Sequence, residues 1–299
     1  MTLMNHFGLF FSQDQLTQAV AQREKSHLKP AFDFLENAPA NDLFLNTLQA
    51  LIVPDLQRGE NFLARWQNSV TSEPKDGVNA ELGELISLLQ LFEMLRVEQS
   101  LEMAQVSMLM SPLVERVERV STHVGDDFVQ NLRLQLVYFL LGIVLEDETA
   151  IQKGIERYQQ AIDDDIHPQG YIREAVGLKS KNSFLRNLQS VEALVLMAEA
   201  GAQIGLPLWE YSKRGLTLLS ATLFPIYYFY TTARWKWDEG LSPEFVQEAF
   251  RSYGGYLEIV NQRIVHRDFQ TLLADLRPIY VPYGGGFTSL THGAVLKRK

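Results

Sequence analysis

The chain has 299 residues, with 27 Lys and Arg against 36 Asp and Glu, and it contains no cysteine. The absence of cysteine excludes a disulfide framework, a Cys-ligated zinc site, an iron–sulfur cluster and a thiol nucleophile. A net charge of −9 disfavours nucleic acid and anionic membranes as partners, so we expect neither. The hydrophobic fraction of 46% and charged fraction of 21% are typical of a globular protein, and we expect a single domain over residues 1–299.

Apolar residues recur at helical spacing along most of the chain, which predicts an all-α protein. Strand signals are weak, and the stretches 224–230 and 279–291 are interpreted as loops or short edge segments. In the helix expected over 185–204, one face carries Leu188, Val191, Val195, Ala198 and Ala202. In chain order, we expect helices after Ser12, over 41–66 with a break at Pro54, over 80–108, from a Ser111-Pro112 cap to His123, and over 125–145, 147–161, 185–204, 207–223, 243–265 and 269–276.

Targeting signals are weak. The longest apolar run, 134–145, is too short to span a bilayer. The N-terminus has neither a basic region nor a small-residue cleavage site, so it does not resemble a signal peptide. We therefore expect a cytoplasmic protein; the alternative is a periplasmic or secreted protein from which a leader has been removed.

Charge is divided unevenly along the chain. Residues 1–150 carry a net charge of −11, whereas residues 151–299 carry +2. The densest basic stretch is 171–186, where Glu174 is the one acidic residue beside Arg173, Lys179, Lys181 and Arg186. This pattern predicts that a site for an anion is built from the second half; the alternative is a solvated surface loop.

Motifs for phosphate and metal binding are missing. The sequence contains no GxGxxG, no GxxxxGK[ST] and no HExxH, so we expect no cofactor and no metal. Asp163-Asp164-Asp165 has oxygen ligands for a hard cation, but three acids after a helix more often form a solvated end. Trp209, Trp235 and Trp237 could stack on sugar rings or be buried in helical interfaces.

Four stretches resemble the alginate lyase (poly-mannuronate lyase) superfamily. They match its opening helix pair, its Asn-containing helix with a partner helix and a Gly-ended loop, a helix ending in Gly before a Leu-Trp segment, and its Gly-rich tail. The stretches are 10–35, 130–170, 183–211 and 284–290. The resemblance implies an all-α (α/α) toroid, an incomplete barrel of helical hairpins around a cleft, and polysaccharide lyase chemistry.

The resemblance also implies the catalytic candidates. The family's Asn-Asn-His cluster falls on Gln130-Asn131-Leu132, which keeps Asn131 but places Leu132 where the histidine stands. The family's Arg falls near Lys179, and its catalytic Tyr falls on Arg186. The catalytic candidates are therefore Asn131, Lys179 and Arg186, in a divergent member that lacks the catalytic His and Tyr.

β-Elimination on a uronate needs a neutralised carboxylate, a base, and an acid for the leaving oxygen. Asn, Lys and Arg side chains can neutralise a carboxylate, but a guanidinium cannot act as a base near neutral pH. A desolvated Lys179 or Lys181 could be the base, and His167 or Tyr171 could donate the proton. The substrate-binding candidates are Arg133, His167, Tyr171, Arg173, Lys181 and Trp235.

Three functions remain open. The first is a divergent lyase-like protein that acts on or binds an acidic saccharide or a small anionic ligand. The second is a catalytically inactive helical scaffold or interaction protein, in which Arg186 and Lys179 form ion pairs with the acidic first half. The third is an enzyme on a small non-polymer substrate. An open groove lined by Trp235, Arg186 and Lys179 favours the saccharide, whereas a filled centre favours the scaffold.

Overall fold

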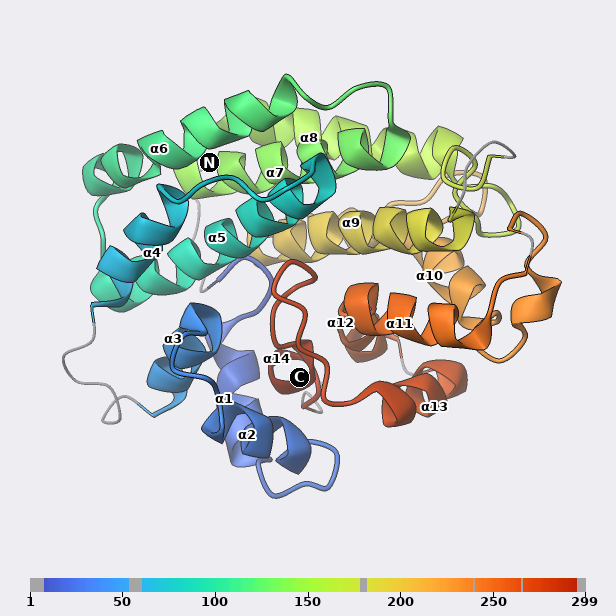
Figure 1. The fold of residues 1–299 in the computed structure, drawn as a ribbon, viewed down its shortest axis with the longest axis horizontal. Coiled ribbons are helices and arrows are strands. Elements are labelled where there is room, and N and C mark those ends of the chain that lie inside the picture. Colours follow the sequence, from blue (N-terminus) through green and yellow to red (C-terminus); the bar gives the residue numbers. More distant parts are fainter. Residues whose placement is uncertain (1–7, 54–60, 178–181, 239, 265, 295–299) are drawn as a thin grey trace.

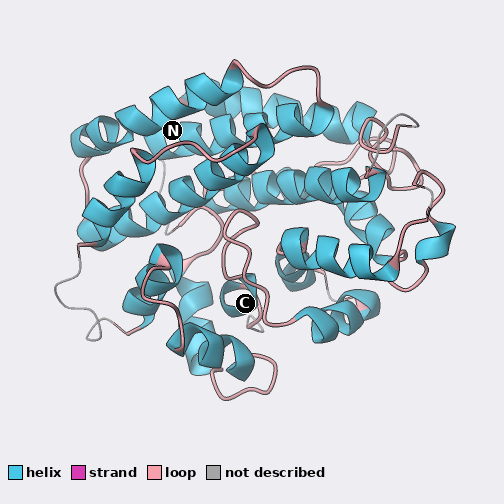
Figure 2. Ribbon diagram, in the orientation of Figure 1, coloured by secondary structure: helices cyan, strands magenta, loops and turns pink. Residues whose placement is uncertain are grey.

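The structure, a computed structural model, describes residues 8–53, 61–177, 182–238, 240–264 and 266–294. Figure 2 shows that these ranges form helices and loops, with no strand among them. The prediction of an all-α protein is therefore confirmed. The α-helices are α1 (Gln13–Ala21), α2 (Lys29–Glu36), α3 (Leu43–Ile52), α4 (Phe62–Val70), α5 (Val78–Gln99), α6 (Met103–Ser121), α7 (Phe128–Leu145), α8 (Glu148–Gln160), α9 (Ser183–Gln203), α10 (Leu218–Ile226), α11 (Pro243–Tyr253), α12 (Tyr256–Arg263), α13 (Arg267–Leu276) and α14 (Thr288–Thr291).

Several helices begin where a side chain can accept a hydrogen bond from the first turn. Ser12 caps α1 and forms a capping box with Gln15. Asp127 caps α7 by accepting the N–H of Gln130, and Asp147 caps α8 by accepting from Thr149 and Ala150. These contacts satisfy backbone donors that a helix start leaves without a partner, and they fix where α7 and α8 begin.

Four of the predicted helix boundaries are wrong. Pro112 lies inside α6 and does not cap it. Its ring and the preceding Met108 face solvent, where water can satisfy the carbonyl that loses its intrahelical partner. Helix α5 ends at Gln99 because Ser100 takes a left-handed conformation with φ of 52°.

The other two differences lie in the second half. Residues 207–223 do not form one helix, since Arg214 and Gly215 both have positive φ and precede α10. The helix expected over 243–265 is split at Gly254-Gly255. A Cβ on Gly255 would lie 2.2 Å from the carbonyl oxygen of Gly284, so this split lets the C-terminal segment approach closely.

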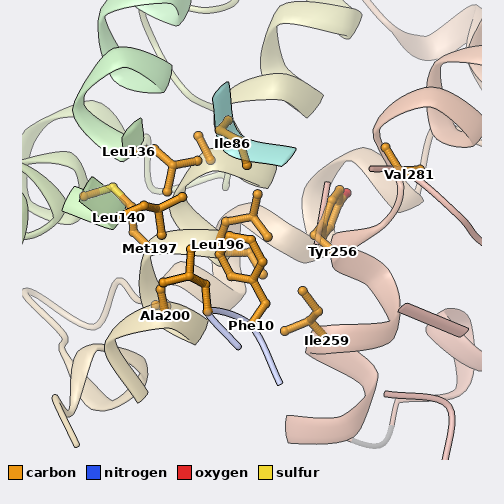
Figure 3. Close-up of a cluster of buried hydrophobic side chains, with 14 of the residues drawn as sticks. Phe10, Ile86, Leu136, Leu140, Leu196, Met197, Ala200, Tyr256, Ile259 and Val281 are labelled. Carbon is orange, nitrogen blue, oxygen red and sulfur yellow. The ribbon is translucent and has the colours of Figure 1, made fainter. Parts of the chain in front are cut away.

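Helix α7 forms the centre of the upper layer in Figure 1 and packs against α5, α8 and α9. It is long and apolar enough to cross a membrane by length and composition, but 67% of that window is buried within the fold. Figure 3 shows Leu136 and Leu140 of this helix packed beside Leu196 and Met197 of α9. This burial and packing make α7 a core helix of the fold.

The C-terminal segment 279–294 lies between the N-terminal helices and α12 (Figure 1). Residues 284–294 are buried throughout. The side-chain amide of Gln90 donates to the carbonyl of Gly285 at 3.1 Å, which ties this segment to α5. The middle of the helical assembly is thus filled by the chain's own backbone, which is the arrangement expected of the scaffold alternative.

Candidate functional site

Two predicted catalytic residues, Asn131 and Arg186, meet at the adjoining starts of α7 and α9. The Nη1 of Arg186 lies 2.5 Å from Oδ2 of Asp127. The side-chain amide of Asn131 donates to the backbone carbonyls of Gly125 at 2.7 Å and Asp127 at 2.9 Å. Both predicted carboxylate-binding groups are therefore already engaged by the loop that leads into α7.

Asp127 is held as a carboxylate by these contacts. Burial would raise its pKa, but the hydrogen bonds from the Gln130 N–H and from Arg186 outweigh this and lower it. The pair joins the acidic first half of the chain to α9, with about a quarter of each side chain exposed (22% for Arg186 and 32% for Asp127). This is the ion pair that the scaffold alternative predicts.

The neighbouring positions do not supply a base. Leu132, which the resemblance placed at the family's histidine position, is fully buried. Asn187, which follows Arg186, is also fully buried, and its Oδ1 accepts the N–H of Ile172 at 2.9 Å. Asn187 therefore anchors the loop after α8 onto α9. Lys179 and Lys181, the remaining candidates for a base, lie outside the described residues.

Arg133 is separated from this group because it points into the protein interior. It is 2% exposed, its Nη1 donates to the carbonyl of Asn79 at 2.9 Å, and its guanidinium lies 5.9 Å from the ring centre of Tyr283. Complete burial raises the pKa of nearby Glu192 well above its usual value, although the charge of Arg133 opposes that shift. These contacts give Arg133 a place in the buried core, away from Arg186.

The predicted substrate-binding residues His167 and Tyr171 lie together on the surface. Their rings stack, with centroids 4.2 Å apart and planes 12° apart. Trp237 joins them, its centroid 4.8 Å from that of Tyr171. The ammonium of Lys236 lies 4.7 Å from the Trp237 centroid and 5.9 Å from the Tyr171 centroid. We call His167, Tyr171, Lys236 and Trp237 the aromatic platform.

Positive charge gathers around the platform. Burial lowers the pKa of His167, and the charges of Arg173 and Lys236 lower it further. The N–H of Gln169 donates to Nδ1 of His167 at 3.1 Å, which places the proton of the neutral ring on Nε2. Arg173 and Lys236 are exposed, so the platform presents two cations and an N–H donor to solvent beside half-buried aromatic rings.

Trp235 and Trp237 occupy different environments although they are two residues apart. Trp235 is 4% exposed, and its Nε1 donates to the hydroxyl of Ser183 at 2.8 Å. It supports the platform from beneath, with its centroid 4.7 Å from that of Trp237. Trp235, which was predicted to bind substrate, lies beneath the platform. Trp237 was named in the sequence only as one of three tryptophans that could stack on sugar rings, and Lys236 was missed; the alternation Trp-Lys-Trp was the signal that could have found it.

Two carboxylates of the acidic run Asp163-Asp164-Asp165 form ion pairs with basic side chains. Lys213 lies 2.5 Å from Oδ2 of Asp163, and Arg157 lies 2.9 Å from Oδ2 of Asp165. Within the described ranges, no group of three or more His, Asp or Glu side chains is placed to hold a metal ion.

Gly170 lies in the loop that joins His167 to Tyr171 of the aromatic platform. We predict that Gly170→Ala displaces this loop. Gly170 has φ of 100°, and a Cβ there would lie 2.4 Å from the carbonyl oxygen of Ser220 in α10. We expect the variant to lose about 1–3 kcal/mol in urea unfolding and to change the near-ultraviolet circular dichroism of the aromatic rings. Gly177→Ala is the matched control, since its Cβ would meet nothing within 4 Å. Equal stability of the two variants would contradict the prediction.

Comparison with known proteins shows the fold, and a family model matches about a third of the chain. Several solved structures with a similar fold are alginate lyases. They show that the helical assembly is an (α/α) toroid, as predicted. Residues 135–235 match the family model described as Alginate lyase, which confirms the resemblance found in the sequence. This segment contains His167, Tyr171 and Arg186, and it begins after Asn131.

Three of these solved structures are of alginate lyase A1-III. A histidine-to-alanine variant complexed with a tetrasaccharide has a TM-score of 0.66 and 16% identity. A tyrosine-to-phenylalanine variant, also complexed with a tetrasaccharide, has a TM-score of 0.63 and 15% identity. The enzyme from Sphingomonas species A1 has a TM-score of 0.59 and 15% identity. Each alignment covers 86% of this chain and 74% of the other. No curated protein matches the chain.

Proposed function

We propose that this protein binds an anionic, uronate-type saccharide at the aromatic platform, without the elimination chemistry of alginate lyases. The observation that carries the proposal is the position of Lys236, whose ammonium stands over the rings of both Tyr171 and Trp237. A uronate has an apolar ring face and a carboxylate, and the platform offers an aromatic face and a cation side by side.

The platform would bind through two kinds of contact. The half-buried rings of Tyr171 and Trp237 would lie against the C–H face of a pyranose. Lys236 and Arg173 would pair with the carboxylate, and Nε2–H of His167 would donate to a hydroxyl or carboxylate oxygen. Exposed ion pairs each contribute only about 0–1 kcal/mol and are screened by salt, so we expect weak, salt-sensitive binding.

Elimination needs a base at C5 of the uronate, and the resemblance places Leu132 and Arg186 at the positions of the family's histidine and tyrosine. A leucine side chain has no proton acceptor, and a guanidinium, here paired with Asp127, cannot act as a base near neutral pH. We therefore expect no unsaturated uronate to form from alginate, as followed by ultraviolet absorbance.

Calorimetric titration with mannuronate oligosaccharides tests the proposal. We expect Lys236→Ala to weaken binding roughly fivefold, the loss of one exposed charge contact. Lys153→Ala is the matched control, because Lys153 is exposed on α8, away from the platform, and it should bind like the wild type. Unchanged affinity in Lys236→Ala, or rapid turnover of alginate, would contradict the proposal.

The helical scaffold is the second candidate, and the Arg186–Asp127 pair and the filled centre favour it. In that case no acidic saccharide binds at any salt concentration, while Arg186→Ala lowers the free energy of unfolding by releasing α9 from the α7 cap. A single titration of the wild-type protein with mannuronate oligosaccharides therefore distinguishes the two candidate functions.

A further inference from the structure

A groove with exposed cations lies in the acidic first half of the chain, on elements that do not contribute to the aromatic platform. It is a cavity of about 320 Å³ between the segment 74–78, the first turn of α5 and the last turns of α6. We call it the α5–α6 groove. The residues on which its chemistry depends are Lys75, Val78, Glu81, Arg116, Arg119 and His123.

The wall of the groove contains a buried ion pair between Glu81 and Arg116. Glu81 accepts from Nε of Arg116 at 2.5 Å and from its Nη2 at 2.9 Å, and the N–H of Lys75 donates to it at 2.8 Å. The remaining nitrogen of Arg116, Nη1, donates to the carbonyl of Ser69 at 3.1 Å. Glu81 and Arg116 therefore cancel each other's charge and are held in the wall by several hydrogen bonds.

The remaining charges of the groove are all positive. Within the described ranges, neither the ammonium of Lys75 nor the guanidinium of Arg119 makes an ion pair, and both side chains are exposed. His123 is engaged through Nδ1, which lies 2.9 Å from the carbonyl of Arg119. Two cations without an ion pair in the lining of one groove are unusual in a half of the chain with a net charge of −11.

The floor of the groove is apolar, because Pro74, Val78 and Val120 line it between the cations. A ligand for this site needs an anionic group for Lys75 and Arg119 and an apolar part for the valines. The volume is at the lower end of the range for small-molecule sites. We propose that the α5–α6 groove binds a small organic anion, a single carboxylate or phosphate on an apolar body of about one aromatic ring.

Titration of the isotope-labelled full chain with phenyl phosphate, followed by amide NMR, tests this inference. We expect saturable shifts at Gly77, Val78 and Arg119, and a roughly fivefold loss of affinity in Lys75→Ala and again in Arg119→Ala. Both residues are exposed, so the variants should keep the fold, which circular dichroism checks. Lys153→Ala on α8 is the matched control and should bind phenyl phosphate like the wild type.

Titrations with other ligands separate the contribution of charge to the affinity from that of apolar contact. Benzoate in place of phenyl phosphate shows which anionic group the cations prefer, and binding of either one supports the inference. Phenol and inorganic phosphate, which each lack one of the two parts, should bind more weakly. Phenol binding as tightly as phenyl phosphate, unchanged affinity in both variants, or the absence of saturable shifts with both anions would overturn it.

Discussion

Arg116→Ala is expected to lower the free energy of unfolding by about 3–5 kcal/mol, because it leaves a buried carboxylate without its cation. Arg116 and Glu81 are each 3% exposed at the side chain and are joined by two hydrogen bonds. The same guanidinium donates to the carbonyls of Ser69 and Val70 at the end of α4. One substitution therefore removes polar contacts that link α6 to both α4 and α5.

Urea unfolding at two pH values measures this effect. Burial would raise the pKa of Glu81, but the hydrogen bond from Arg116 and the other contacts bring it below its usual value. The pair therefore stabilises the wild type above the ordinary carboxyl pKa, and that contribution is lost as the pH falls. The difference between variant and wild type should shrink in acid. Arg119→Ala, an exposed change on the same helix, is the control, and a loss from Arg116→Ala below about 1 kcal/mol would contradict the account.

Leu188→Ala is expected to cost about 2–5 kcal/mol, because Leu188 is fully buried in α9, which packs against α7. The lost methyl groups leave a cavity beside α9 that cannot close without moving a helix. Leu185→Ala on the same helix is the matched control, since Leu185 is only half-buried and should lose less. Equal losses in the free energy of unfolding for the two variants would show that the buried face of α9 is assigned to the wrong residues.

Elements defined by local signals were predictable from the sequence. Asp127 and Asp147 mark helix starts by their own side chains, and the apolar face of α9 is visible because Leu188, Val191, Val195 and Ala198 recur at helical spacing. Pro112 was misread because a proline on the exposed face of a helix is tolerated, and exposure is a tertiary property.

The site depended on contacts that the sequence does not display. Arg186 pairs with Asp127, 59 positions earlier, and that partner decides whether the guanidinium is available to a ligand. Trp235 and Trp237 look equivalent in the sequence, and the hydroxyl of Ser183 is what fixes Trp235 inside the core. His167 and Tyr171, both candidates from the sequence, lie against each other because the short loop between them keeps the two rings close.

The structure of the protein with a bound mannuronate tetrasaccharide tests the central claim most directly. The account predicts a pyranose ring against Tyr171 or Trp237, a uronate carboxylate within hydrogen-bond distance of Lys236 or Arg173, and an intact Arg186–Asp127 pair. A saccharide bound at Arg186 with the Asp127 pair broken, or no bound saccharide at saturating concentration, would contradict it.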